Sequence, residues 1–126
     1  MGKTEALRKV VTSILRETDC EVYYEKARKD AEFPYVVYTF DTINFDYYAR
    51  DDIFLLIEVW DKNKTSSKIE EIADLIENLL NYRNHPTDEV LPTFYLESRK
   101  SVEDEDATIL HRQIRVKIEN YYIGGR

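Results

Sequence analysis

The chain has 126 residues, the length of one domain, and 43% of them are hydrophobic, with ten Tyr and five Phe available for one core. It carries 18 basic and 25 acidic residues, and its net charge of −7 opposes non-specific attraction to nucleic-acid phosphates and to anionic membranes. One cysteine excludes an intrachain disulfide, and no apolar run approaches the roughly 18 residues that span a bilayer. We therefore expect a single α+β domain over residues 1–126.

The first third of the sequence predicts a helix followed by two strands. In residues 4–17 apolar side chains recur at helical spacing, which is the stripe of an amphipathic helix with one buried face. Residues 20–24 form a short β-prone segment, which predicts an edge strand. Residues 35–40 read YVVYTF and follow Pro34, a residue that is tolerated at the start of a strand.

The remaining sequence predicts a strand, a helix and a final pair of strands. Residues 53–60 are largely apolar on both faces, which places this strand centrally in the sheet or against another subunit. Ser67 and Glu70 have the spacing of a capping box, and apolar residues then fall on one helical face. Strands follow at 93–99 and 109–118, and in the second of them Ile114 and Val116 alternate with Arg115 and Lys117, the pattern of a half-exposed strand. The expected fold class is α+β, with two helices packed on one face of a mainly antiparallel sheet of four to five strands and with long hairpin loops.

Two connections between expected strands are unusually long for hairpins. They are residues 41–52 and 100–108, whereas hairpin loops usually have about two to five residues. Most of the acidic excess lies near them: residues 41–61 hold six acidic and one basic residue, and residues 88–106 hold seven and two. Long loops with exposed aromatic side chains are frequent binding surfaces on a stable scaffold. We expect a protein interface at Phe45, Tyr47, Tyr48, Arg50 and Trp60.

No arrangement of residues in the sequence points to catalysis. Cys20 lies between two carboxylates, whose charges raise its pKa and disfavour the thiolate that a nucleophile requires. His85 and His111 stand alone, without the spacing of metal ligands. The acidic run 103–106 lacks the spaced positions and the central Gly of a calcium-binding EF-hand loop. We therefore predict no catalytic, metal or cofactor site, and we expect that the chain is not an enzyme.

Four segments resemble the tail-terminator and tail-completion proteins of long-tailed phages and prophages. These segments are FPYVVY at 33–38, FLLIEVWD at 54–61, the helix at 67–81 and HRQIRVK at 111–117. The resemblance implies a structural virion protein that forms a homo-oligomer, a hexameric ring in the virion, and is a monomer in solution. Such a ring caps the tail tube, contacts the tube protein and the head-tail connector protein, and lets DNA pass without specific binding.

The resemblance also gives the acidic segments an expected role. An acidic lumen lets DNA slide without sticking, because like charges remove phosphate-binding sites. The implied location is the virion, at the head-tail interface, with the host cytoplasm during assembly and no membrane contact. We expect one acidic hairpin to line the lumen, through residues drawn from Asp46, Asp51, Asp52, Glu103, Asp104, Glu105 and Asp106.

Other interpretations remain open from the sequence. A head-tail connector adaptor shares nearly all of these features. An acidic inhibitor or DNA mimic requires carboxylates spread over one face at phosphate-like spacing and no self-assembly. A ferredoxin-like ligand-binding domain requires a concave pocket with converging polar groups. A metal-dependent nuclease requires Asp51, Asp52 and Glu58 to come together.

Overall fold

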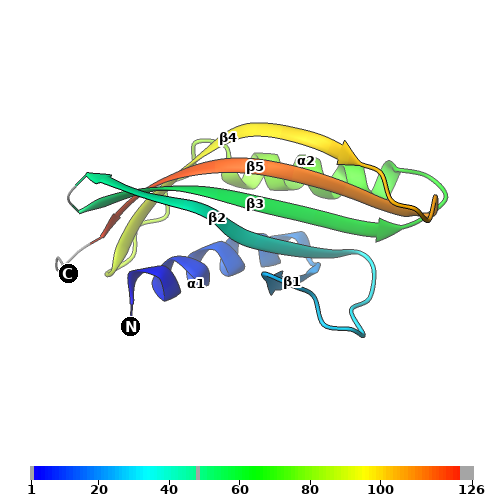
Figure 1. Ribbon diagram of the computed structural model, residues 1–126, viewed down its shortest axis with the longest axis horizontal. Helices are drawn as coiled ribbons and strands as arrows, with labels where there is room; N and C mark the ends of the chain where they lie inside the picture. The colour runs from blue at the N-terminus through cyan, green and yellow to red at the C-terminus, as the bar shows by residue number, and fades with distance from the viewer. Residues whose placement is uncertain (1, 48, 123–126) are drawn as a thin grey trace.

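The computed structural model describes residues 2–47 and 49–122. Within them, two helices lie against one face of a five-stranded sheet, which confirms the expected α+β class (Figure 1). Neither helix is long and apolar enough to cross a membrane. In chain order the elements are α1 (Lys3–Leu15), a 3-10 turn η1 (Arg16–Thr18), β1 (Glu21–Tyr24), β2 (Tyr35–Tyr47), β3 (Arg50–Lys62), α2 (Ser67–Leu80), β4 (Val90–Val102) and β5 (Ile109–Tyr122).

The strands lie in the order β1-β2-β3-β5-β4. β1 runs parallel to β2, and the other neighbouring pairs are antiparallel. β1 is an edge strand, and β3 lies centrally between β2 and β5, as their sequences predict. A central strand contacts neighbours on both sides and can bury apolar residues on both faces, which explains the two apolar faces of β3.

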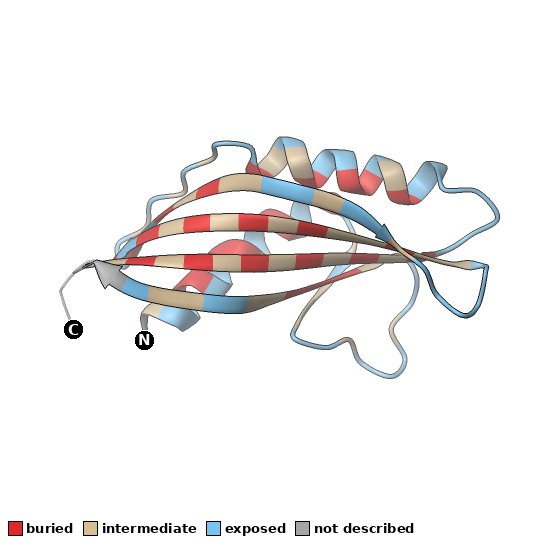
Figure 2. Cartoon of the chain, turned by 45° about the horizontal axis from the view of Figure 1, so that its top comes forward, coloured by how far each residue is buried: buried red, intermediate tan, exposed pale blue. Residues whose placement is uncertain are grey.

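The core lies between the helices and one face of the sheet. Both helices bury the apolar stripes that their periodicity predicts, because residues three and four apart share one side of a helix. In β3 and β5 the buried residues alternate with half-buried ones, so the two faces of the sheet differ (Figure 2). The largest fully buried side chains are Tyr38, Phe94, Leu7, Ile14, Leu15, Leu55, Ile57, Ile69, Ile76, Leu80, Ile114 and Ile118.

The start of α2 differs from the expected capping box. Ser66 is the N-cap residue and makes no side-chain capping hydrogen bond, while Ser67 is the first helical residue. Glu70 accepts a hydrogen bond of 2.7 Å from Nε of Arg112 and forms an ion pair of 3.1 Å with Arg99. These charge-assisted contacts to β5 and β4 are stronger than a local bond to a backbone N–H, so Glu70 ties the helix to the sheet.

The first expected hairpin loop is strand almost throughout. β2 continues to Tyr47 and β3 begins at Arg50, so the connection consists of residues 48 and 49. The second of these has φ 65°, the left-handed conformation that suits a tight turn. The expectation of a long loop at 41–52 is wrong because side chains in this segment find partners across the strands, and a bulge after Phe40 absorbs the change in register.

The second expected loop is shorter than predicted, because β4 continues to Val102 and β5 begins at Ile109. This leaves residues 103–108 as the connection. The two hairpin connections lie at opposite ends of the sheet (Figure 1). The paired length of β3 and β5 separates them by roughly 40 Å.

Candidate assembly interface

In the described part of the chain no helix covers the second face of the sheet, which we call the open face (Figure 1). Along β3 its side chains are half-buried, whereas the alternate side chains, from Asp51 to Asp61, are buried. Val37 also lies on this face and is 6% exposed, although it is not part of the core cluster. The open face is made mainly by Tyr23, Tyr35, Val37, Arg50, Asp52, Phe54, Leu56, Glu58, Trp60, His111, Arg115, Lys117, Glu119 and Tyr121.

One end of the open face, the aromatic end, is formed by Phe33, Tyr35, Trp60 and His111. The rings of Trp60 and His111 stack with centroids 3.7 Å apart and planes 14° apart. Tyr35 stacks on the other side of Trp60 at 6.5 Å, and Phe33 lies 5.4 Å from Tyr35. The register places Tyr35, Trp60 and His111 side by side on β2, β3 and β5. Cross-strand pairing therefore builds a continuous aromatic row.

His111 belongs to this row as a neutral ring. Its side chain is 6% exposed, and its Nε2 lies 3.0 Å from a carboxylate oxygen of Glu58. Burial lowers the pKa of His111 from 6.5, because it disfavours the charged imidazolium, and the charge of Glu58 opposes this shift. The uncharged form stacks on Trp60 without placing a bare cation against the aromatic surface.

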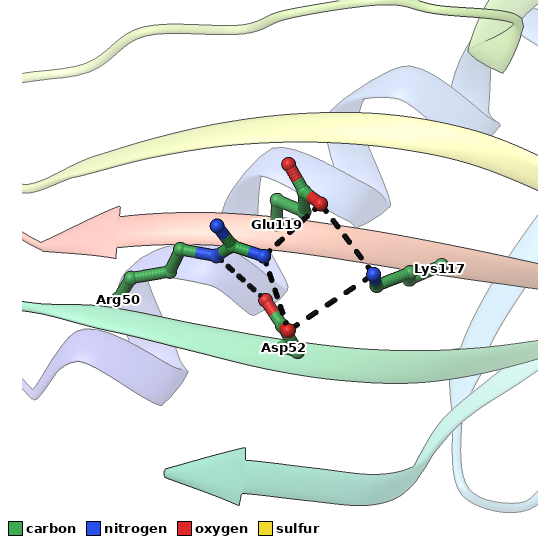
Figure 3. Close-up of polar contacts among 4 residues, drawn as sticks. All are labelled: Arg50, Asp52, Lys117 and Glu119. Carbon is green, nitrogen blue, oxygen red and sulfur yellow. Dashed lines mark hydrogen bonds and ion pairs between the residues drawn. The ribbon is translucent and has the colours of Figure 1, made fainter. Parts of the chain in front are cut away.

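The other end of the open face, the charged end, is formed by Arg50, Asp52, Lys117 and Glu119 (Figure 3). Arg50 donates from Nε to Asp52 at 2.8 Å and from Nη2 to Glu119 at 3.1 Å. Lys117 lies 3.4 Å from Glu119 and 4.0 Å from Asp52. The hydrogen bond with Asp52 raises the pKa of Arg50 above its ordinary value. Two cations and two carboxylates thus neutralise each other, and this end carries no net charge.

Arg115 occupies the middle of the open face. Its guanidinium lies 4.4 Å from the ring of Phe54 and donates to Glu97 at 3.0 Å, with Asp41 at 3.8 Å. Arg115 and Lys117 share a face, as the alternation of β5 predicts, but both are engaged by carboxylates. They are therefore poorly suited to bind phosphates.

The residues predicted for a protein interface do not form one cluster. Phe45 is 66% exposed near the β2–β3 connection, and Arg50 belongs to the charged end. Trp60 belongs to the aromatic end, ten residues further along β3 and hence roughly 33 Å away. Tyr48 lies outside the described residues, and the side chain of Tyr47 is likewise not described.

Two residues predicted to line an acidic lumen are neutralised instead. Asp51 is 2% exposed, faces the helices and lies 2.8 Å from Nζ of Lys3, at the start of α1. Asp52 faces the opposite side and pairs with Arg50. Alternation along β3 carries each of these carboxylates to a different cationic partner, so neither is free within one copy, and their place in a lumen stays a prediction. The side chain of Asp46 is not described. Glu103, Asp104, Glu105 and Asp106 are exposed.

Several residues of the open face escaped the sequence prediction. Tyr35, Lys117 and Glu119 lie in or next to predicted strands, but their neighbours on the open face follow only from the register between strands, which the sequence alone does not give. The metal cluster considered for Asp51, Asp52 and Glu58 does not form, since Asp51 lies on the other face. Cys20 is half-buried, and burial is the main cause that raises its pKa.

Comparison with known proteins agrees with this architecture. A chain of the virion of the native gene transfer agent particle has a similar fold, with a TM-score of 0.60, 11% sequence identity, and coverage of 86% of this chain and 85% of that chain. A comparison with curated protein sequences gives no match. The family model described as Tail completion protein gp17 matches residues 4–119, from the first turn of α1 to near the end of β5. The chain therefore belongs to this family of phage tail completion proteins.

Proposed function

We propose that the chain completes the phage tail as a ring of identical subunits at the end of the tail tube that joins the head connector, with DNA passing through the ring. The family match over residues 4–119 is the observation that carries this proposal. The occurrence of a similar fold in a gene transfer agent virion is consistent with it. The chemistry of the open face adds support, because its charged side chains form ion pairs with one another.

The open face supplies a surface for assembly. It combines aromatic side chains with aliphatic residues such as Leu56 and Val37, a mixture that is typical of the core of protein interfaces. Trp and Tyr contribute much of the binding energy at such sites because they bury a large area with few rotatable bonds. We propose that the aromatic end and Leu56 contact a neighbouring subunit or the tail tube.

The experiment compares two identical substitutions on opposite sides of the molecule. Leu56→Arg places a charge in the middle of the open face, and Leu75→Arg places it on the outer side of α2, where Leu75 is 39% exposed. Tails made without this gene are mixed with filled heads and with each purified protein, and joined particles are counted by electron microscopy. We expect the natural protein and Leu75→Arg to join heads to tails, and Leu56→Arg to lose most of this activity.

Unfolding in urea is the control for both variants, because the loss of joining counts as evidence only if the Leu56→Arg protein is folded. Normal joining by a folded Leu56→Arg protein would reject the open face as an interface. Failure of the natural protein to join heads to tails would reject the assignment to tail completion.

A further inference from the structure

The outer side of α1 carries an excess of positive charge, from cations that form no ion pair within the described chain. Six residues along this helix line an open hollow of about 540 Å³; five of them are exposed, and Thr12, which is half-buried, bonds to the hydroxyl of Tyr38. Three of them, Arg8, Lys9 and Arg16, are exposed cations, against one carboxylate, Glu5. The lining residues are Glu5, Arg8, Lys9, Thr12, Ser13 and Arg16, and we call this surface the α1 hollow.

The arginines of the α1 hollow differ from the others. Within the described residues, Arg8 and Arg16 have no carboxylate within ion-pair distance. The guanidinium of Arg8 lies 3.9 Å from the ring centre of Tyr24, a contact that positions it and leaves its charge uncompensated. The remaining described arginines each have at least one acidic partner, namely Arg28, Arg50, Arg83, Arg99, Arg112 and Arg115.

The β4–β5 connection carries an excess of negative charge. Its residues Glu103, Asp104, Glu105 and Asp106 are exposed, and none of them has an ion-pair partner among the described residues. The loop is nevertheless ordered by its own hydrogen bonds: Asp106 accepts from the Thr108 hydroxyl at 2.7 Å, and Asp104 accepts from the Asp106 N–H at 2.9 Å. Four carboxylates are thus presented on a loop whose shape is already set, which reduces the entropy cost of docking.

The two surfaces cannot satisfy each other within one copy. The acidic loop projects beyond the end of β4 and β5, whereas α1 lies beneath the sheet (Figure 1). A contact between two different surfaces of identical chains is head-to-tail and generates rings when the rotation closes. Each copy also has a net charge of −7, so self-association needs a local attraction that outweighs the general repulsion.

We infer that the acidic loop 103–106 of one copy docks in the α1 hollow of the next copy. This inference rests on the proposed ring and names the contact that closes it. Four carboxylates meet three cations, so each copy offers one complementary end to each neighbour. If the loop lined the DNA lumen instead, the cations of α1 would have no partner in the ring. The experiment distinguishes this alternative from docking between copies.

The test is a chemical crosslink between a lysine of α1 and a carboxylate of the loop. Equal amounts of ¹⁴N-labelled and ¹⁵N-labelled full-length protein are added to tails made without this gene, at about 20 mM salt, and treated with a carbodiimide, which condenses a lysine amine with a carboxylate in direct contact. We expect mixed-isotope peptides that join Lys9 to the loop 103–106, and their loss at about 0.5 M salt, where exposed charges are screened.

Charge reversal supplies the specific control. Arg8→Glu with Arg16→Glu should lower the yield of these crosslinks at least about tenfold. A partner carrying Glu103→Arg with Asp104→Arg should restore crosslinks from Lys9 of the first variant to Glu105 or Asp106 of the second. Lys29→Glu with Lys64→Glu changes the net charge equally at exposed sites outside the hollow, and should leave the yield unchanged.

The absence of Lys9 crosslinks between copies, an equal loss in the Lys29 and Lys64 control, or no rescue by the second variant each overturns the contact. The loop variant lies wholly in an exposed connection, so it keeps the test decisive if the α1 variant does not fold. Head joining by the natural protein without Lys9–loop crosslinks, with joining unaffected in the loop variant but DNA ejection slowed, would overturn the contact and assign the loop to the lumen. Failure of the ring contact leaves the head-joining assay free to test tail completion separately.

Discussion

The two ends of the open face cover their side chains by different means. At the aromatic end, Trp60 and His111 cover each other by stacking at 3.7 Å. At the charged end, Arg50 and Asp52 cover each other through a hydrogen bond of 2.8 Å and reach across to β5. Both solutions depend on side chains from neighbouring strands, and neither depends on a helix.

The difference teaches which end a partner can cover more easily. An aromatic surface gains free energy when it is removed from water, at roughly 25 cal/mol for each Å² of apolar area. A network of ion pairs loses hydration when it is covered, and its mutual attraction often only balances that loss. We therefore expect the aromatic end to supply most of the binding energy and the charged end to contribute alignment.

The largest expected effect is at the aromatic end. Trp60→Ala removes the ring between Tyr35 and His111, and we expect a loss of about 2–3 kcal/mol in the free energy of unfolding. Urea denaturation measures this loss. Trp60→Phe should recover most of it, because a smaller ring still stacks on both neighbours, and equal losses in the two variants would contradict the role of stacking.

A smaller effect is expected at the charged end. Asp52→Asn keeps the shape of the side chain but removes the charge that faces Arg50 and Lys117, and should cost about 1 kcal/mol of stability. The difference from the natural protein should narrow at about 0.5 M salt, since exposed parts of the network are screened. If the difference is independent of salt, the network acts by packing and not by charge.

The pH dependence of stability also distinguishes the two ends. The pKa of His111 is lowered in the folded protein, mainly by burial, so protons bind the unfolded chain more readily. Stability should therefore be complete above pH 6.5 and should fall as the pH drops through that value towards the folded pKa. Glu58 and Asp104 oppose the shift and Arg112 reinforces it.

Chemical denaturation at several pH values between about 7 and 5 measures this slope. His111→Phe should flatten it while keeping a ring against Trp60. Glu70 acts in a different window, because the hydrogen bond from Arg112 lowers its pKa below 4.5, so its stabilisation is lost only in more acid solution. An unchanged slope in His111→Phe would assign the pH dependence to other groups.

The smallest effect on stability is expected for Phe45→Ser, beyond the charged end. Phe45 is 66% exposed, and Lys3 lies 5.4 Å from its ring centre, so the change should stay within about 0.5 kcal/mol. Thermal unfolding measures the change. Because the fold is preserved, any loss of head joining in this variant reports a contact made by Phe45 with another protein.

The sequence by itself determined the elements whose evidence is local. Helical periodicity located α1 and α2, two apolar faces identified β3 as central, and alternation in β5 separated Ile114 and Val116 from Arg115 and Lys117. These patterns survive folding because helix and strand periods are properties of the backbone, independent of what the chain packs against.

Only the tertiary structure decided which polar groups meet. Arg50 and Glu119 are 69 residues apart and pair through the register of β3 with β5. Pairing of β2 with β3 turned an expected loop into strands, and alternation along β3 then sent Asp51 and Asp52 to opposite faces. Register is set by the sum of many cross-strand contacts, and a shift by one residue would exchange the two faces, so no local pattern of charges reveals which carboxylates remain free.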